Sequence, residues 1–95
     1  MPVYMVERVL PGATLESVGA MQRVAEETCR AFTAEGRRIR YLRSTFVPGE
    51  SRCRCLFEAA HGDLVQEVNE VAQIPYNRIV LAVELSSTRR LDRPP

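Results

Sequence analysis

Two successive stretches of the chain show the same order of hydrophobic patterns. Each begins with the alternation of a strand, continues with apolar residues three and four positions apart, as in an amphipathic helix, and ends in a second extended segment. A chain of 95 residues is long enough for one small domain and too short for two. We therefore expect a single domain with the order strand, helix, strand, strand, helix, strand.

Turn and cap residues define the limits of the elements in the first stretch. A strand over residues 3–9 is followed by a turn at Pro11, and a long helix begins after the predicted N-cap Thr14 and stops before Gly36. The helix carries an apolar stripe that includes Cys29, so we expect one side of it to face a core.

The rest of the chain starts with a hairpin around Pro48-Gly49. The remaining elements are expected at four places: strands over residues 39–47, 52–58 and 78–85, and a helix over residues 63–74. Asp63 and Gln66 form a capping-box pattern at the start of that helix, and Pro75 ends it. Residues 86–95 lack periodicity, which predicts a flexible tail behind a domain of residues 1–85.

This order of elements is that of the ferredoxin-like βαββαβ fold, an α+β architecture with both helices on one face of a four-stranded antiparallel sheet. One parity of strand positions is mostly apolar and should lie beneath the helices: Tyr4, Val6, Ile39, Tyr41, Cys53, Cys55, Phe57, Ile79, Leu81 and Val83. The other parity mixes charged residues with eight apolar ones: Val3, Met5, Val9, Leu42, Phe46, Leu56, Val80 and Ala82. A bulge near Pro48-Gly49 would exchange the two faces.

The mixed face is too apolar to remain in contact with water. A second copy packed sheet to sheet about a two-fold axis would cover it, because each patch then meets itself. We therefore expect a homodimer through the sheet face, similar in shape to a dimeric α+β barrel.

Charge and cysteine content limit the classes of partner. The net charge of +1 gives no reason to expect nucleic acid or a membrane, and no run is long enough to span a bilayer. RNA-binding proteins of this topology expose stacking aromatic residues on their central strands, whereas the segment RCRCLFEA offers only Phe57, so we do not expect nucleic acid. Three cysteines are too few for a disulfide framework, which indicates reduced thiols and a cytoplasmic location.

The three cysteines are candidates for a metal or redox site. Cys53 and Cys55 are two apart on a strand and point to the same face, and Cys29 lies on the helical stripe that faces the sheet, so the thiols can converge. Thiolates bind copper(I), zinc or nickel. The alternative is simple core packing, because free cysteine is among the most buried residue types.

Three carboxylates share one parity on different strands: Glu7, Glu58 and Glu84. Grouped carboxylates can bind a cation or raise one another's pKa. Arg40 and Arg54 have the same parity and can neutralise them, so the alternative is a set of ion pairs between subunits.

The remaining candidates are single polar residues. His61, just before the second helix, is either a metal ligand or general base, or an exposed cap. Tyr41, Asn69 and Tyr76 are placed where a pocket between the sheet and the second helix would have its polar lining. The same residue types are common as hydrogen-bonded groups at the edge of a core.

Three segments carry a resemblance to a known family: YMVER near the start, STFVPGESRCRCLFEA in the hairpin and VNEVAQIPYNRIVLAVEL at the end. From about Val3 to Leu85 the chain resembles small bacterial proteins with a ferredoxin-like fold that are associated with nickel binding. The resemblance implies a dimeric module related in shape to the dimeric α/β-barrel monooxygenases, with nickel or another transition-metal ion as a ligand. Members use histidine, whereas here His61 is the only one and Asn69 stands where the second helix often has another.

Three kinds of function remain open at this point. The leading hypothesis is a cytoplasmic homodimeric module that binds a small ligand or a metal ion. The second is a small cofactor-independent enzyme of the barrel-monooxygenase kind, for which a closed apolar cavity with unpaired polar groups would argue. The third is an assembly module whose dimer face is its whole function.

Overall fold

The computed structural model describes residues 1–85, so the tail predicted over residues 86–95 lies outside the described residues. The elements follow the expected order: β1 (Val3–Val9), α1 (Leu15–Ala34), β2 (Ile39–Val47), the short 3-10 helix η1 (Pro48–Glu50), β3 (Arg52–Ala59), α2 (Gly62–Val71) and β4 (Arg78–Ala82).

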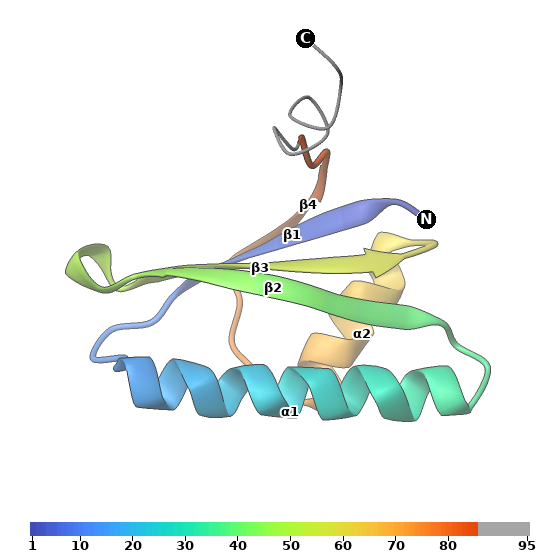
Figure 1. Ribbon diagram of the computed structural model, residues 1–95, viewed down its shortest axis with the longest axis horizontal. Helices are drawn as coiled ribbons and strands as arrows, with labels where there is room; N and C mark the ends of the chain where they lie inside the picture. The colour runs from blue at the N-terminus through green and yellow to red at the C-terminus, as the bar shows by residue number, and fades with distance from the viewer. Residues whose placement is uncertain (86–95) are drawn as a thin grey trace, which may run out of the picture.

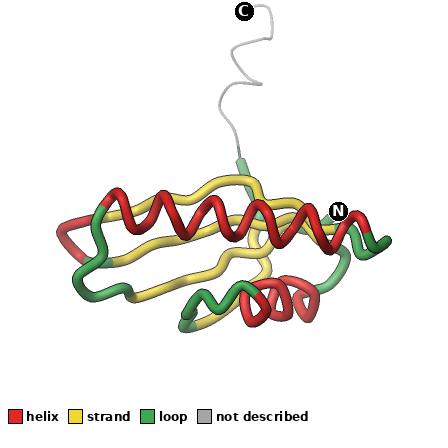
Figure 2. The backbone as a smooth tube through the Cα atoms, turned by 90° about the horizontal axis from the view of Figure 1, so that it is seen from below, coloured by secondary structure: helices red, strands yellow, loops and turns green. Residues whose placement is uncertain are grey.

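The four strands form one antiparallel sheet in the order β2-β3-β1-β4. Both helices pack on the same face of this sheet, and within residues 1–85 no helix covers the other face (Figures 1 and 2). The ferredoxin-like fold predicted from the sequence is therefore confirmed. We call the two sides of the sheet the covered face and the open face.

Helix α1 begins and ends where the sequence predicts. Thr14 is its N-cap: the Thr14 hydroxyl accepts from the backbone N–H of Ser17, and the Ser17 hydroxyl accepts from the backbone N–H of Thr14. Gly36 follows the helix with φ of +87°, a conformation that favours glycine. The buried stripe of α1 faces the sheet and consists of Val18, Ala25, Cys29 and Phe32.

The ends of α2 and β4 differ from the prediction. The N-cap of α2 is His61, whose side chain makes no capping hydrogen bond, so the capping box of Asp63 with Gln66 is wrong. The helix ends at Val71, and Gln73, with φ of +57°, turns the chain toward the last strand before Pro75 is reached. β4 ends at Ala82 rather than at residue 85.

A bulge in β2 changes which side chains face the helices. Tyr41 pairs with Phe57, but the next pair along is Arg43 with Leu56, so Leu42 is an extra residue. Every later residue of β2 is displaced by one position, which puts Phe46 opposite Cys53 on the covered face. The sequence analysis placed Phe46 on the other face, which is wrong; the bulge that it considered near Pro48-Gly49 lies instead at Leu42.

The core lies between the covered face and the two helices. Its most buried side chains come from β1, β3 and α2 and include Val6, Cys53, Cys55, Phe57, Val65 and Val68. Leu81 and Val83, predicted beneath the helices, are instead exposed, because the helices do not cover the end of the edge strand β4. Neither helix within residues 1–85 combines the length and apolar character that a membrane crossing requires.

Candidate functional site

A buried arginine lies on the covered face, near the end of β1. Arg8 is on β1 with the same parity as Val6, and only 1% of its surface is exposed. Its guanidinium donates three hydrogen bonds: from Nε to Cys55 Sγ at 3.3 Å, from Nη1 to the carbonyl oxygen of Pro75 at 3.0 Å, and from Nη2 to Asn69 Oδ1 at 2.6 Å. None of these three acceptors is a carboxylate oxygen.

This arrangement favours a negative charge beside Arg8. A guanidinium keeps its proton in proteins, and a buried charge without a counter-charge costs several kcal/mol. Of the three acceptors, the Cys55 thiol is the one group that can ionise. A Cys55 thiolate next to Arg8 gives the buried site a net charge of zero.

Two further groups hold the Cys55 sulfur. The Ser44 hydroxyl donates to it at 3.0 Å, and the Cys53 sulfur lies 3.8 Å away. Hydrogen bonding from Cys53, together with the charge of Arg8, lowers the pKa of Cys55 to about 6 in spite of its burial. The same contact with Cys55, together with burial, raises the pKa of Cys53. The two shifts favour a thiolate at Cys55 and a thiol at Cys53.

The network continues to two of the predicted polar candidates. The hydroxyl of Tyr41 and that of Ser44 are 2.6 Å apart, and the Tyr41 ring packs edge-on against Phe57. Asn69 on α2, fully buried, accepts from Arg8 and donates from Nδ2 to the carbonyl oxygen of Val65 at 2.8 Å. Every buried side-chain nitrogen or oxygen within residues 1–85 has a hydrogen-bond partner.

Four residues proposed from the sequence thus meet in this network: Tyr41, Cys53, Cys55 and Asn69. The sequence analysis missed Arg8 and Ser44. Arg8 had a detectable signal, because it shares the parity of Tyr4 and Val6 and lies opposite Cys53 in the register. Ser44 had none, because only the bulge before it turns its side chain to this face.

The other proposed metal ligands lie elsewhere. Cys29 is buried on α1, where burial raises the pKa of its thiol to about 12. His61 is exposed at the start of α2. Across residues 1–85, no group of three or more His, Cys, Asp or Glu side chains is arranged to hold a metal ion. The three thiols therefore do not converge as the sequence suggested.

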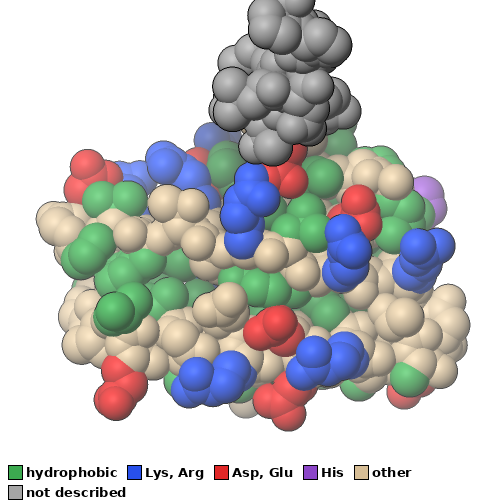
Figure 3. All heavy atoms as spheres, in the orientation of Figure 1, with side chains coloured by type: hydrophobic (Ala, Val, Ile, Leu, Met, Phe, Trp, Pro, Cys, Tyr) green, Lys and Arg blue, Asp and Glu red, His purple; other side chains and the backbone are tan. Residues whose placement is uncertain are grey.

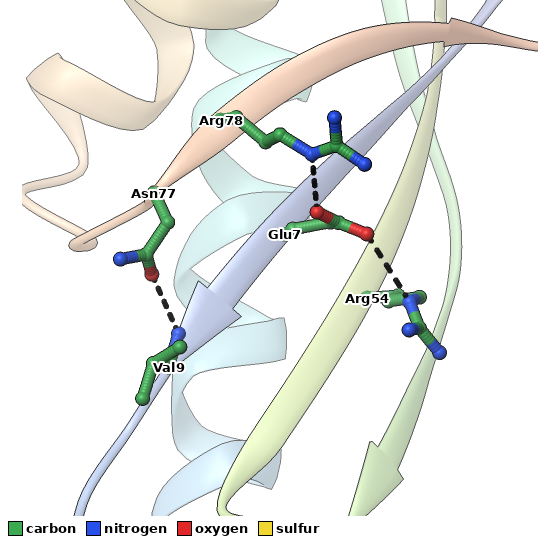
Figure 4. A network of polar contacts seen from close by, with 5 residues as sticks. All are labelled: Glu7, Val9, Arg54, Asn77 and Arg78. Carbon is green, nitrogen blue, oxygen red and sulfur yellow. Dashed lines mark hydrogen bonds and ion pairs between the residues drawn. The ribbon is translucent and has the colours of Figure 1, made fainter.

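The carboxylates proposed from the sequence are found in ion pairs on the open face. Glu7 lies between Arg78 on β4 and Arg54 on β3, and accepts a hydrogen bond from each (Figure 4). The hydrogen bond from Arg78 is the main cause that lowers the pKa of Glu7. Beside this group, the Asn77 side chain accepts from the backbone N–H of Val9 at 2.6 Å.

The two other glutamates have partners of the same kind. Glu58 pairs with Arg40 at 3.6 Å, and Glu84 pairs with Arg43. These pairs form within one chain, whereas the sequence analysis expected pairs between subunits. Tyr76 joins neither the buried network nor these pairs, because its hydroxyl donates to Glu70 on α2 at 3.0 Å.

Two hollows adjoin these features. An open groove of about 740 Å³ runs between the first half of α1 and residues 72–75 and is mostly apolar. A smaller cavity of about 80 Å³ is lined by Arg8, Cys53 and Asn77, together with neighbouring residues of β1 and β3. Acidic and basic side chains are interspersed on the side of the molecule shown in Figure 3, so no field of a single sign marks a partner there.

Comparison with known proteins places this fold and site in context. Residues 4–81 match the family described as nickel responsive protein SCO4226-like. The structure is similar to the crystal structure of SCO4226 from Streptomyces coelicolor A3(2), with a TM-score of 0.69 and 19% identity over 88% of this chain and 98% of that chain. No curated protein sequence matches the chain. Because the family match spans most of its length, this chain belongs to the SCO4226-like family of nickel responsive proteins.

Proposed function

We propose that the protein is a cytoplasmic homodimeric binding module whose two copies associate through the open faces of their sheets. The observation that carries this proposal is an apolar centre on that face. Met5 lies between Leu56 on β3 and Val80 on β4, and the neighbouring pair of Val3 with Ala82 extends the patch. All five side chains are partly exposed in the single chain.

Ion pairs surround this apolar centre. Glu7 with its two arginines lies at one end and Glu58 with Arg40 at the other, while Glu84, which follows β4, pairs with Arg43 on the opposite edge strand β2. An apolar centre within a charged rim is the usual anatomy of a protein interface. A two-fold axis through the patch would bury the centre of both copies at once.

A small enzyme would need an enclosed cavity with a polar group free to act on substrate. In the described part of the chain, the buried polar groups are already engaged with one another. This favours a binding module over the enzyme alternative.

The family description names nickel, and the donor set beneath the sheet does not fit that ion. Nickel prefers several imidazole, thiolate or carboxylate ligands in a defined geometry. Cys53 and Cys55 supply two sulfurs, the exposed His61 is not grouped with them, and residues 1–85 add no third donor. The guanidinium of Arg8 already contacts Cys55, so a divalent ion would leave a net positive charge in a buried site.

Light scattering of the purified protein at micromolar concentration tests the proposal. We expect the parent to be a dimer and Leu56→Asp to be a monomer, because the substitution puts an unpaired charge into the interface. Leu15→Asp is the matched control: Leu15 is 79% exposed at the start of α1, away from the open face. A monomeric parent, or a dimer that survives Leu56→Asp with unchanged circular dichroism, would contradict the proposal.

A further inference from the structure

We propose that Cys53 and Cys55 form a two-thiolate site for one soft monovalent metal ion of the copper(I) type. The two sulfurs are 3.8 Å apart on the same face of β3, and each residue is 1% exposed. This inference concerns the covered face and does not depend on dimerisation through the open face.

The distance between the sulfurs suits a single bridging ion. A metal–thiolate bond is about 2.3 Å long for zinc, so a linear sulfur–metal–sulfur unit spans about 4.6 Å. The pair can hold an ion at a bent angle as it stands, or in a linear unit if the sulfurs separate by less than about 1 Å. Soft thiolates select copper(I), which two sulfurs can satisfy, whereas zinc sites take four ligands.

The net charge of the occupied site favours a monovalent ion over nickel(II). Arg8 brings one positive charge beside the Cys55 sulfur. When a monovalent ion binds, each cysteine ligates it as a thiolate, any proton still on a sulfur leaves to solvent, and one metal–sulfur bond forms at each cysteine without electron transfer. The two thiolates, the ion and the guanidinium then sum to zero. A divalent ion would leave one uncompensated positive charge, which burial makes costly.

The surrounding residues give the ion a fixed site. A cavity of about 80 Å³, also lined by neighbouring residues of β1 and β3, reaches Cys53 and Arg8. Ser44 keeps its hydrogen bond to Cys55, and Asn69 holds the far side of the guanidinium. These contacts hold the counter-charge beside the sulfurs before the ion arrives, which lowers the cost of binding.

Anaerobic titration of the reduced full-length protein with copper(I), in competition with a chromophoric copper(I) chelator, tests this proposal. We expect one ion per protomer. Cys53→Ser and Cys55→Ser should each weaken binding by more than the roughly 100-fold that loss of a supporting partner costs. Cys29→Ser is the matched control, because Cys29 is equally buried but lies on α1 outside the pair. It should bind as the parent does.

X-ray absorption of the copper-loaded parent removes any dependence on how well the variants fold. We expect two sulfur neighbours per copper, and we expect nickel(II) to leave the thiols unaltered in the same titration. Absence of stoichiometric binding, a copper shell of only nitrogen or oxygen atoms, an equal loss in Cys29→Ser, or displacement of copper by nickel would each overturn the proposal. The light-scattering experiment uses metal-free protein, so the two proposals fail separately.

Discussion

Neighbouring residues on β1 put their charges on opposite faces of one sheet. Glu7 lies on the open face with two arginines in contact with water, whereas Arg8 lies on the covered face and is 1% exposed. On the open face, each of the three candidate glutamates forms an ion pair with an arginine. On the covered face, Arg8 donates hydrogen bonds to a cysteine sulfur, an amide oxygen and a carbonyl oxygen.

This difference indicates that burial, more than the number of partners, decides how much a charged side chain contributes to the free energy of unfolding. An exposed ion pair exchanges water for a partner at little net gain, and salt screens it. When a partner of a buried guanidinium is removed, water cannot replace the lost hydrogen bond, so each partner contributes strongly to stability. The covered face should therefore be sensitive to substitutions that the open face tolerates.

The largest effect is expected from Arg8→Met compared with Arg54→Met. Removing Arg8 leaves Asn69 and Cys55 without their donor, which should lower the free energy of unfolding by about 3–5 kcal/mol. Arg54→Met removes an exposed ion pair and should cost about 0–1 kcal/mol. Urea unfolding of the two variants measures both values. Equal losses would remove the distinction between the two faces.

A smaller effect is expected from Asn69→Leu, which keeps the size of the side chain but removes its polar atoms. The variant loses the hydrogen bond from Arg8 and the one to Val65, and should be less stable by about 1.5–3 kcal/mol. Gln66→Leu, on the exposed side of the same helix, serves as the control. If both variants unfold at the parent's urea concentration, Asn69 does not hold the guanidinium.

The pH dependence of stability should reveal the Cys55 thiolate. Its pKa in the folded protein is about 6, below that of an ordinary thiol near 8.5, so unfolding takes up a proton between these values. The stabilisation is complete above about pH 8.5 and is lost as the pH falls through about 6. Urea unfolding of the parent should show a rise of up to about 1.4 kcal/mol per pH unit that Cys55→Ser lacks.

The smallest effect is expected from Glu7→Gln on the open face. The arginines lower the pKa of Glu7 below its usual value, so its contribution is present near neutral pH and disappears as the pH falls through that lowered pKa. When the pH is lowered from neutral to acid, the free energy of unfolding should therefore fall slightly more in the parent than in the variant. Added salt should reduce the difference. A salt-resistant effect would mean that Glu7 is not part of a solvated pair.

The contrast between the faces also marks what the sequence could predict. Alternation, the Thr14 cap and the Gly36 stop predicted the element order and most of α1, because these signals are local. The bulge at Leu42 left no mark in the composition, and it reversed the prediction for Phe46. The end of α2 was also mispredicted, because Gln73 turns the chain before Pro75 does.

The candidate site was predicted only in part for a related reason. Parity placed Cys53 and Cys55 together, while Tyr41 and Asn69 were predicted separately, with Tyr76, as the polar lining of a pocket between the sheet and the second helix. Arg8 was overlooked because a charged residue in a strand usually marks a solvent-facing position. Its burial depends on partners contributed by β3, α2 and Pro75, which lie more than forty residues further along the chain.

The pairing of Arg8 with a Cys55 thiolate is the central claim, and the ultraviolet absorbance of thiolate in the native protein tests it most directly. Titration of the parent against Cys55→Ser should show one additional thiolate per protomer at neutral pH, which is protonated only as the pH falls through about 6. Cys29 and Cys53 should remain protonated at neutral pH, since burial raises the pKa of the first and the contact with Cys55 that of the second. Identical absorbance in the two proteins until the pH reaches that of ordinary thiols, near 8.5, would contradict the account.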